Sequence, residues 1–173
     1  KLKDVVMVKK DCCLYFQGCI TLVQSILQKK TMINLSVNNT NPSYQYDSTS
    51  ISRLCELVLK DTDYESISLN IIFCDDERLS KLKAQYFNED VLTDVLAFPI
   101  ENDTMLESEI YISYDRALSS SKEFNVSLNS ELVRLIVHGL LHLLGYKDDD
   151  AISKKIMFDK QEAIVKSCNI KII

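Results

Sequence analysis

The sequence is short of the residues from which metal and disulfide frameworks are usually built. It has only two histidines, and its six cysteines form no C-x-x-C pair. A zinc ribbon and a disulfide framework are therefore not indicated, and we expect reduced, mostly buried thiols in a cytoplasmic protein. No stretch reaches the roughly 18 apolar residues of a membrane helix, so we expect no membrane contact.

Basic residues are in the minority. The chain has 20 Lys and Arg against 25 Asp and Glu, which gives a net charge of −5. An autonomous RNA-binding protein usually displays a basic surface, so the charge argues mildly against unaided binding of nucleic acid. Lys147, Lys154, Lys155 and Lys160 form one local group, which is either a basic patch or a solvated helix face.

The length of the chain suits a single globular domain, because 173 residues with 46% hydrophobic content can bury one ordinary core. Residues 1–31 have basic flanks, an interrupted apolar middle and no small-residue cleavage site, which argues against a signal peptide. We expect them to be an N-terminal extension, either an accessory helix or an over-extended start. The domain then spans residues 32–173.

Hydrophobic periodicity predicts the class of fold. Alternation predicts strands at 33–37, 66–74, 95–98 and 110–113, with a hairpin-like link at 101–107. Helical spacing predicts helices that begin near residues 47–48 and 75–76, and others at about 115–124, 131–144 and 151–168. Strands gathered early and helices late predict an α+β fold, a single domain with one mixed β-sheet packed with helices.

Both histidines stand in one short stretch, which is the clearest chemical signal in the chain. His138 and His142 are four residues apart in an apolar segment, so on a helix both rings point the same way and can bind one metal ion. Glu131 and Arg134 continue the same stripe, and the remaining circumference is too apolar for a surface helix. We therefore predict a metal site on a buried helix and the loop after it.

A carboxylate beyond this helix can complete the site. Gly145 supplies the left-handed residue that often ends a helix, so Asp148, six residues after His142, can fold back as a third ligand. Asp149 and Asp150 are alternatives, because one of the three aspartates can instead cap the next helix. Three protein ligands with one open position are typical of catalytic zinc sites, so we expect one Zn²⁺ per chain.

The histidine stretch resembles the signature of the YbeY family of bacterial endoribonucleases, His-Gly-x-x-His-Leu-x-Gly-Tyr. Residues 93–99 (Thr-Asp-Val-Leu-Ala-Phe-Pro) and 108–113 (Ser-Glu-Ile-Tyr-Ile-Ser) are similar to two further family motifs, as are Arg116-Ala117 and Glu131-Leu-x-Arg134. The likeness runs from about Met32 to the C-terminus. It implies a metal-dependent, single-strand-specific endoribonuclease that matures the 3′ end of small-subunit ribosomal RNA and serves ribosome quality control.

The resemblance also implies partners and a reaction. The substrate would be a ribosomal RNA precursor, reached through small-subunit ribosomal proteins or a ribosome-associated GTPase. The reaction would be metal-assisted phosphodiester hydrolysis, with either water or the ribose 2′-hydroxyl as nucleophile.

Two positions depart from the family pattern. Asp148 stands where the family has its third metal-binding histidine, and Phe87 stands where it usually has an arginine after tyrosine. A carboxylate ligand leaves the divalent site with one positive charge fewer, which should acidify bound water less. Phe87 removes a candidate phosphate clamp, because only a planar guanidinium matches phosphate oxygens with two hydrogen bonds.

In addition to the candidate metal ligands, three residues are candidate catalytic residues, namely Arg134, Asp94 and Thr93. Arg134 lies one turn before His138 and either contacts phosphate or pairs with a neighbouring glutamate. Thr93 and Asp94 either line the cleft and orient a ligand histidine, or Asp94 only caps a loop.

A second resemblance, to metzincin metalloproteases with their His-Glu-x-x-His-x-x-Gly-x-x-His or Asp motif, fails at Gly139. Those enzymes carry there the glutamate that takes the proton from water. Gly139 either leaves space for substrate or a neighbouring backbone, or lets the helix pack closely. A metallohydrolase of another substrate class, peptides included, and a non-catalytic ribosome-assembly factor are the alternative functions.

Overall fold

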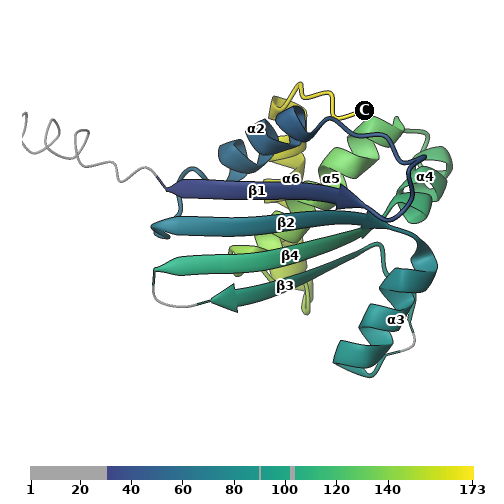
Figure 1. Ribbon diagram of the computed structural model, residues 1–173, viewed down its shortest axis with the longest axis horizontal. Coiled ribbons are helices and arrows are strands. Elements are labelled where there is room, and N and C mark those ends of the chain that lie inside the picture. Colours follow the sequence, from purple (N-terminus) through teal and green to yellow (C-terminus); the bar gives the residue numbers. More distant parts are fainter. Residues whose placement is uncertain (1–30, 90, 102–103) are drawn as a thin grey trace, which may run out of the picture. The chain divides into compact units, whose positions relative to one another are not determined.

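A four-stranded mixed sheet is the centre of the computed structural model, which describes residues 31–89, 91–101 and 104–173 (Figure 1). The strands are β1 (Met32–Asn39), β2 (Ser66–Cys74), β3 (Val95–Glu101) and β4 (Met105–Ser113), in the order β1-β2-β4-β3. β1, β2 and β4 run parallel to one another, and β3 is antiparallel to β4. The predicted mixed sheet and the hairpin are confirmed. The prediction for residues 1–31 lies outside the described residues, apart from Thr31.

Five helices complete the described part of the chain. They are α2 (Ser48–Leu59), α3 (Asp76–Phe87), α4 (Tyr114–Glu123), α5 (Leu128–Leu143) and α6 (Ala151–Ser167). Figure 1 shows α2, α5 and α6 gathered on one side of the sheet, with α3 beyond the end of β2. α5 is the central helix, since it contacts β3, β4 and three other helices. In the described segments, no helix is long and apolar enough to cross a bilayer.

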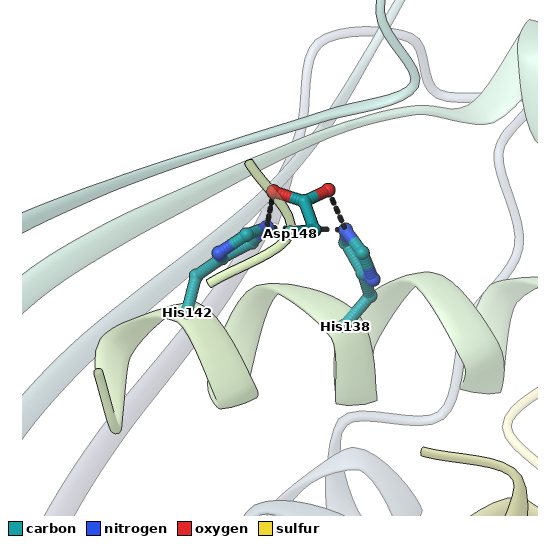
Figure 2. Close-up of side chains that lie close together, drawn as sticks. All are labelled: His138, His142 and Asp148. Atoms are coloured by element: carbon teal, nitrogen blue, oxygen red, sulfur yellow. Dashed lines mark hydrogen bonds and ion pairs between the residues drawn. The ribbon is translucent and has the colours of Figure 1, made fainter. Parts of the chain in front are cut away.

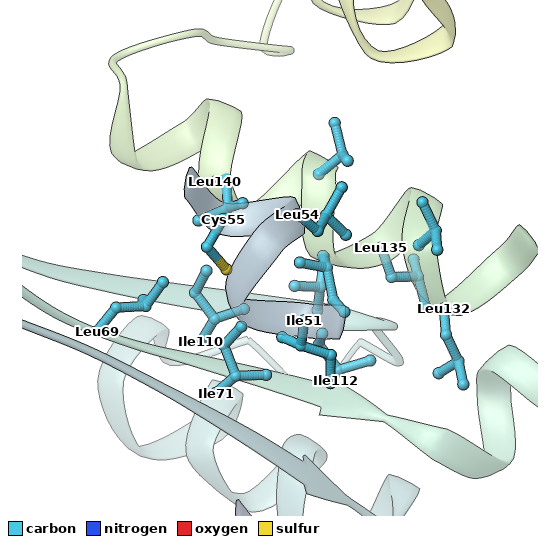
Figure 3. Packing of buried hydrophobic residues seen from close by; sticks show 14 of the residues in the cluster. Ile51, Leu54, Cys55, Leu69, Ile71, Ile110, Ile112, Leu132, Leu135 and Leu140 are labelled. Atoms are coloured by element: carbon cyan, nitrogen blue, oxygen red, sulfur yellow. The ribbon is translucent and has the colours of Figure 1, made fainter. Parts of the chain in front are cut away.

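Alternate side chains of the central strands form the main hydrophobic core. β2 buries Ile67, Leu69, Ile71 and Phe73 on the face that the helices cover. Each fully buried side chain of this size contributes about 1.5–3 kcal/mol of transfer free energy. Apolar side chains of α2 and α5 pack against them, among them Ile51, Leu54, Leu132 and Leu140 (Figure 3). The sheet and α5 are thereby held in a fixed relation.

The opposite face of the sheet carries a smaller cluster under α3. Cys74 and Leu96 follow Phe73 and Val95 in sequence, so they point to the other face of their strands. There they pack with Leu79 of α3. The described cysteines 55, 74 and 168 are free thiols, and the first two are buried.

The starts of two elements differ from the prediction by three residues or more. α5 begins at Leu128, three residues before the expected Glu131, because the Ser127 hydroxyl caps it by accepting from the Ser130 backbone N–H at 3.1 Å. The strand expected at 110–113 begins at Met105, since its first half pairs with β2 as well as β3.

Candidate metal centre

The end of α5 fixes the loop that carries the third candidate ligand. Gly145 has φ +82°, and its N–H donates to the His142 carbonyl at 3.0 Å. The Tyr146 N–H reaches back to the Leu141 carbonyl at 3.0 Å, the bond that closes a left-handed helix end. The chain therefore turns back over the last turn of α5. The predicted role of Gly145 as the helix stop is confirmed.

His138, His142 and Asp148 come together at this turn (Figure 2). The two Nε2 atoms lie 3.1 Å apart. The Asp148 carboxylate oxygens lie 4.0 Å from Nε2 of His138 and 3.9 Å from Nε2 of His142. One ligand atom from each residue falls within 4.8 Å of the others. Asp150 instead caps α6, accepting from the Ile152 N–H at 2.8 Å.

Each ring has an oxygen partner on the side away from the other ring, at Nδ1. The Tyr146 backbone carbonyl, which can only accept, lies 3.1 Å from Nδ1 of His142. The Gln161 Oε1 lies 2.9 Å from Nδ1 of His138. When Nδ1 carries the hydrogen in both neutral rings, each N–H has an oxygen acceptor, and both Nε2 lone pairs are left for one cation. A shared cation stabilises such a pair.

The ligand set fits one divalent ion. Two ligand atoms at about 2.0–2.1 Å from a tetrahedral zinc lie about 3.3 Å apart, close to the observed separation of the imidazole nitrogens. The Asp148 side chain, 45% exposed, needs to approach by less than an ångström. Burial lowers the pKa of His142, and the adjacent His138 lowers it further. Both effects favour the neutral ring that metal binding requires.

A hydrogen-bonded network supports His138 from α6. The Gln161 Nε2 donates to Glu162 Oε1 at 3.4 Å, which orients the amide so that its oxygen faces His138. Arg134 donates from Nε to the same Glu162 oxygen at 3.0 Å and from a terminal nitrogen to Glu131 at 2.6 Å. The hydrogen bond from Arg134 lowers the pKa of Glu162 and keeps it an acceptor. Arg134 is thus ion-paired with two glutamates rather than free.

Two of the other sequence candidates, Thr93 and Asp94, hydrogen-bond to the ends of β3 and β4. The Thr93 hydroxyl donates to the Val95 carbonyl at 3.1 Å, and the Asp94 carbonyl accepts from the Ser113 N–H at 2.9 Å. In the described residues no hydrogen bond or ion pair joins either side chain to the candidate ligands. Phe87 ends α3, and its ring centroid lies 5.9 Å from that of Phe98.

Gly139 faces the sheet rather than a substrate cleft. A Cβ atom added there would lie 2.9 Å from Cγ2 of Ile110 and 3.4 Å from Cγ2 of Val95. The helix needs the missing side chain in order to pack on β3 and β4. Of the two explanations for this glycine, close helix packing is the one that the structure supports. A glutamate at this position would collide with the core.

Sequence reasoning missed Gln161 and the Tyr146 carbonyl. Gln161 is only 5% exposed and lies 23 positions from His138 along the chain. Its spacing from Met157 shows that the two share a helix face, but not which helix that face meets. A backbone carbonyl leaves no signal in the sequence at all.

Two histidines and a carboxylate form the kind of three-ligand set found at catalytic metal sites, so the site places the protein in the class of metal-dependent hydrolases. Comparison with known proteins identifies the family within this class. The chain belongs to the YbeY endoribonuclease family, because the family model described as "Endoribonuclease YbeY" matches residues 32–169.

Individual relatives agree with this assignment. The chain is 33% identical over 147 residues to the "Endoribonuclease YbeY" of Finegoldia magna, covering 79% of this chain and 94% of that protein. It is 39% identical over 94 residues to the protein of the same name from Flavobacterium johnsoniae, covering 54% and 68%. The solution structure of TM1509 from Thermotoga maritima matches with a TM-score of 0.54 and 27% identity, covering 78% of this chain and 87% of that one.

Proposed function

We propose that this protein is a zinc-dependent, single-strand-specific endoribonuclease that matures the 3′ end of small-subunit ribosomal RNA and serves ribosome quality control. The observation that carries the proposal is the pair of Nε2 atoms, 3.1 Å apart, beside a carboxylate. Family membership supports RNA as the substrate. The proposed location is the cytoplasm, and the proposed partners are precursor ribosomal RNA, small-subunit proteins and a ribosome-associated GTPase.

In this proposal His138, His142 and Asp148 hold one zinc ion per chain. A bound zinc ion supplies a Lewis-acid centre for a phosphate oxygen or a water molecule. Gln161 and the Tyr146 carbonyl keep both Nδ1 protons pointing away from the centre, so the rings stay oriented. Cleavage of an RNA with 2′-deoxyribose at the scissile position distinguishes water from the 2′-hydroxyl as the attacking group.

Arg134, Thr93 and Asp94 stay predictions as catalytic residues. For Arg134 we propose an indirect role, since it holds the glutamate that orients Gln161. A direct contact with phosphate is its alternative role, and this requires Arg134 to leave one of its two glutamates. Thr93 and Asp94 lie where β3 begins, and their proposed role is to shape the edge of the cleft.

The structure does not favour the alternative function, peptide hydrolysis. A metzincin-like mechanism needs a glutamate at Gly139, where a single added carbon already meets Ile110 at 2.9 Å.

The test combines metal analysis with RNA cleavage. Untagged protein should contain one zinc per chain and cleave precursor small-subunit ribosomal RNA in a chelator-sensitive manner. His138→Ala and Asp148→Ala should lose metal and cleavage together. Stoichiometric metal with intact RNA would instead support a non-catalytic assembly factor, and cleavage that survives both substitutions would point to a contaminating nuclease.

A further inference from the structure

A small cavity lies directly beside the candidate metal ligands. His138 and Asp148 form one wall, and α6 supplies the rest of the lining through Lys154, Met157, Phe158 and Gln161. Its volume is about 100 Å³. A space of this kind needs only about 10–15 Å³ to hold one water molecule, so the cavity has room for a small polar group such as a phosphate.

The four residues of α6 share one helix face, since they are spaced three, four and seven residues from the first. Met157 and Gln161 are almost fully buried and close the inner side. Lys154 is exposed, and Phe158 keeps 56% of its surface exposed. The cavity therefore has an apolar and amide floor, with a cation and an aromatic ring on its solvent side.

Lys154 differs from its neighbouring lysines. Lys155 pairs with Asp159 at 2.8 Å on the solvent side of α6, and Lys160 lines a separate pocket formed with residues of the α2 end. Within the described segments, no ion pair joins Lys154 to a carboxylate. Of the lysines on α6 that lie in these two pockets, Lys154 is the one beside the metal ligands.

Lys154 can compensate for the lower positive charge of the candidate metal site. Asp148 as a ligand leaves a divalent site with one positive charge fewer than a third histidine would. Lys154 restores that charge on the other side of the cavity. A flexible ammonium is a general partner of phosphate oxygens, although it lacks the bidentate geometry of arginine.

We propose that this cavity is a phosphate subsite, in which Lys154 binds the RNA phosphate next to the one at the metal centre and Phe158 stacks against the adjoining base. The proposal rests on the ribonuclease function proposed above. It assigns to α6 the contact with the RNA backbone that Phe87, at the end of α3, cannot make. Stacking on an exposed aromatic ring tolerates any base, so this subsite adds affinity without sequence specificity.

The first experiment measures binding of a short fluorescent single-stranded RNA in the presence of a chelator, over a series of KCl concentrations. Lys154→Gln should lower the slope of log affinity against log salt by about 0.7, and affinity by about fivefold at 0.1 M salt. Lys155→Gln is the matched control, because it removes the same charge one residue away. Lys154→Arg should retain both affinity and slope.

The second experiment concerns the ring. Phe158→Ala should weaken RNA binding by about fivefold or more at an unchanged salt slope, since stacking is not a charge contact. Ile156→Ala is its control, because Ile156 is also 56% exposed on α6 but does not line the cavity.

The outcomes separate this inference from the function on which it rests. If wild type cleaves RNA but Lys154→Gln matches Lys155→Gln in affinity, slope and KM, the subsite is wrong and the ribonuclease proposal stands. If wild type neither binds nor cleaves RNA, the ribonuclease proposal is wrong, and the subsite proposal that rests on it is wrong as well. Zinc affinity should not fall in either lysine variant; a fall confined to Lys154→Gln would mean that Lys154 supports the metal centre, which would contradict its assignment to a phosphate subsite.

Discussion

Replacing Gln161 tests the claim that α6 sets the protonation of a metal ligand. In the Gln161→Leu variant, Nδ1 of His138 loses the oxygen that lies 2.9 Å away. Without metal, the ring can move its proton to Nε2 and donate to His142 across 3.1 Å, so the metal-free protein loses little stability. A bound cation removes that alternative, because it needs the Nε2 lone pair. The cost therefore falls on metal binding.

The size of the effect can be worked out in two ways. Loss of a hydrogen-bond partner behind a ligand histidine typically lowers metal affinity by about 10- to 100-fold, or about 1.4–2.7 kcal/mol. A buried N–H left without an acceptor costs about 1–3 kcal/mol. The two estimates agree, so we expect the zinc dissociation constant of Gln161→Leu to rise by about 10- to 100-fold.

The assay is competition with a chromophoric zinc chelator, with the Co²⁺ absorption spectrum as a second readout of ligand geometry. Gln161→Glu should retain most of the affinity, because a carboxylate also accepts the Nδ1 proton. Gln85→Leu, on the exposed face of α3, controls for the substitution itself. An unchanged zinc affinity in Gln161→Leu would refute the reasoning. So would a loss of unfolding free energy in the metal-free protein as large as the loss of zinc-binding free energy.

Three further predictions concern Asp148, Gly139 and the buried cysteines. Asp148→Ala should abolish stoichiometric zinc binding, measured by metal analysis after dialysis, whereas Asp148→His should retain it, since imidazole is also a zinc ligand. Gly139→Ala should lower the free energy of unfolding in urea by up to about 2 kcal/mol, because overpacking costs about 1–3 kcal/mol and alanine regains about 1 in helix propensity; a stabilised variant would contradict the close packing at 2.9 Å. Burial raises the pKa of Cys55 and Cys74 to about 12, so at pH 8 both thiols should alkylate far more slowly than Cys168 by mass spectrometry of the native protein.

The candidate metal ligands could be brought together from the sequence because they are local. His138 and His142 are one helix turn apart, and Gly145 and Asp148 follow within six residues, so helix geometry alone brings them together. The strands were predictable from alternation for the same reason. The order β1-β2-β4-β3 was not part of the prediction, because a strand's pattern of buried residues does not name its partner.

What the sequence left undetermined depends on contacts between distant elements. The supporting Gln161 and the cavity residue Lys154 both lie on α6, and their spacing identifies a helix face without identifying its neighbour. The helix start at Leu128 was missed because Asn129 and Ser130 are weak helix formers that hide the first turn. Gly139 had two explanations until the side chain of Ile110 was placed against it.

Asp148, the candidate carboxylate ligand, lies in a loop that is anchored at both ends. Gly145 fixes one end of the connection in the left-handed conformation, and Asp150 fixes the other by capping α6. Asp148 lies between these two anchors, so its backbone has little freedom to advance or retreat. The Asp148 carboxylate oxygens lie 3.9–4.0 Å from the two Nε2 atoms, which are 3.1 Å from each other. Closing that gap needs a rotation of an exposed side chain, not a change of the fold.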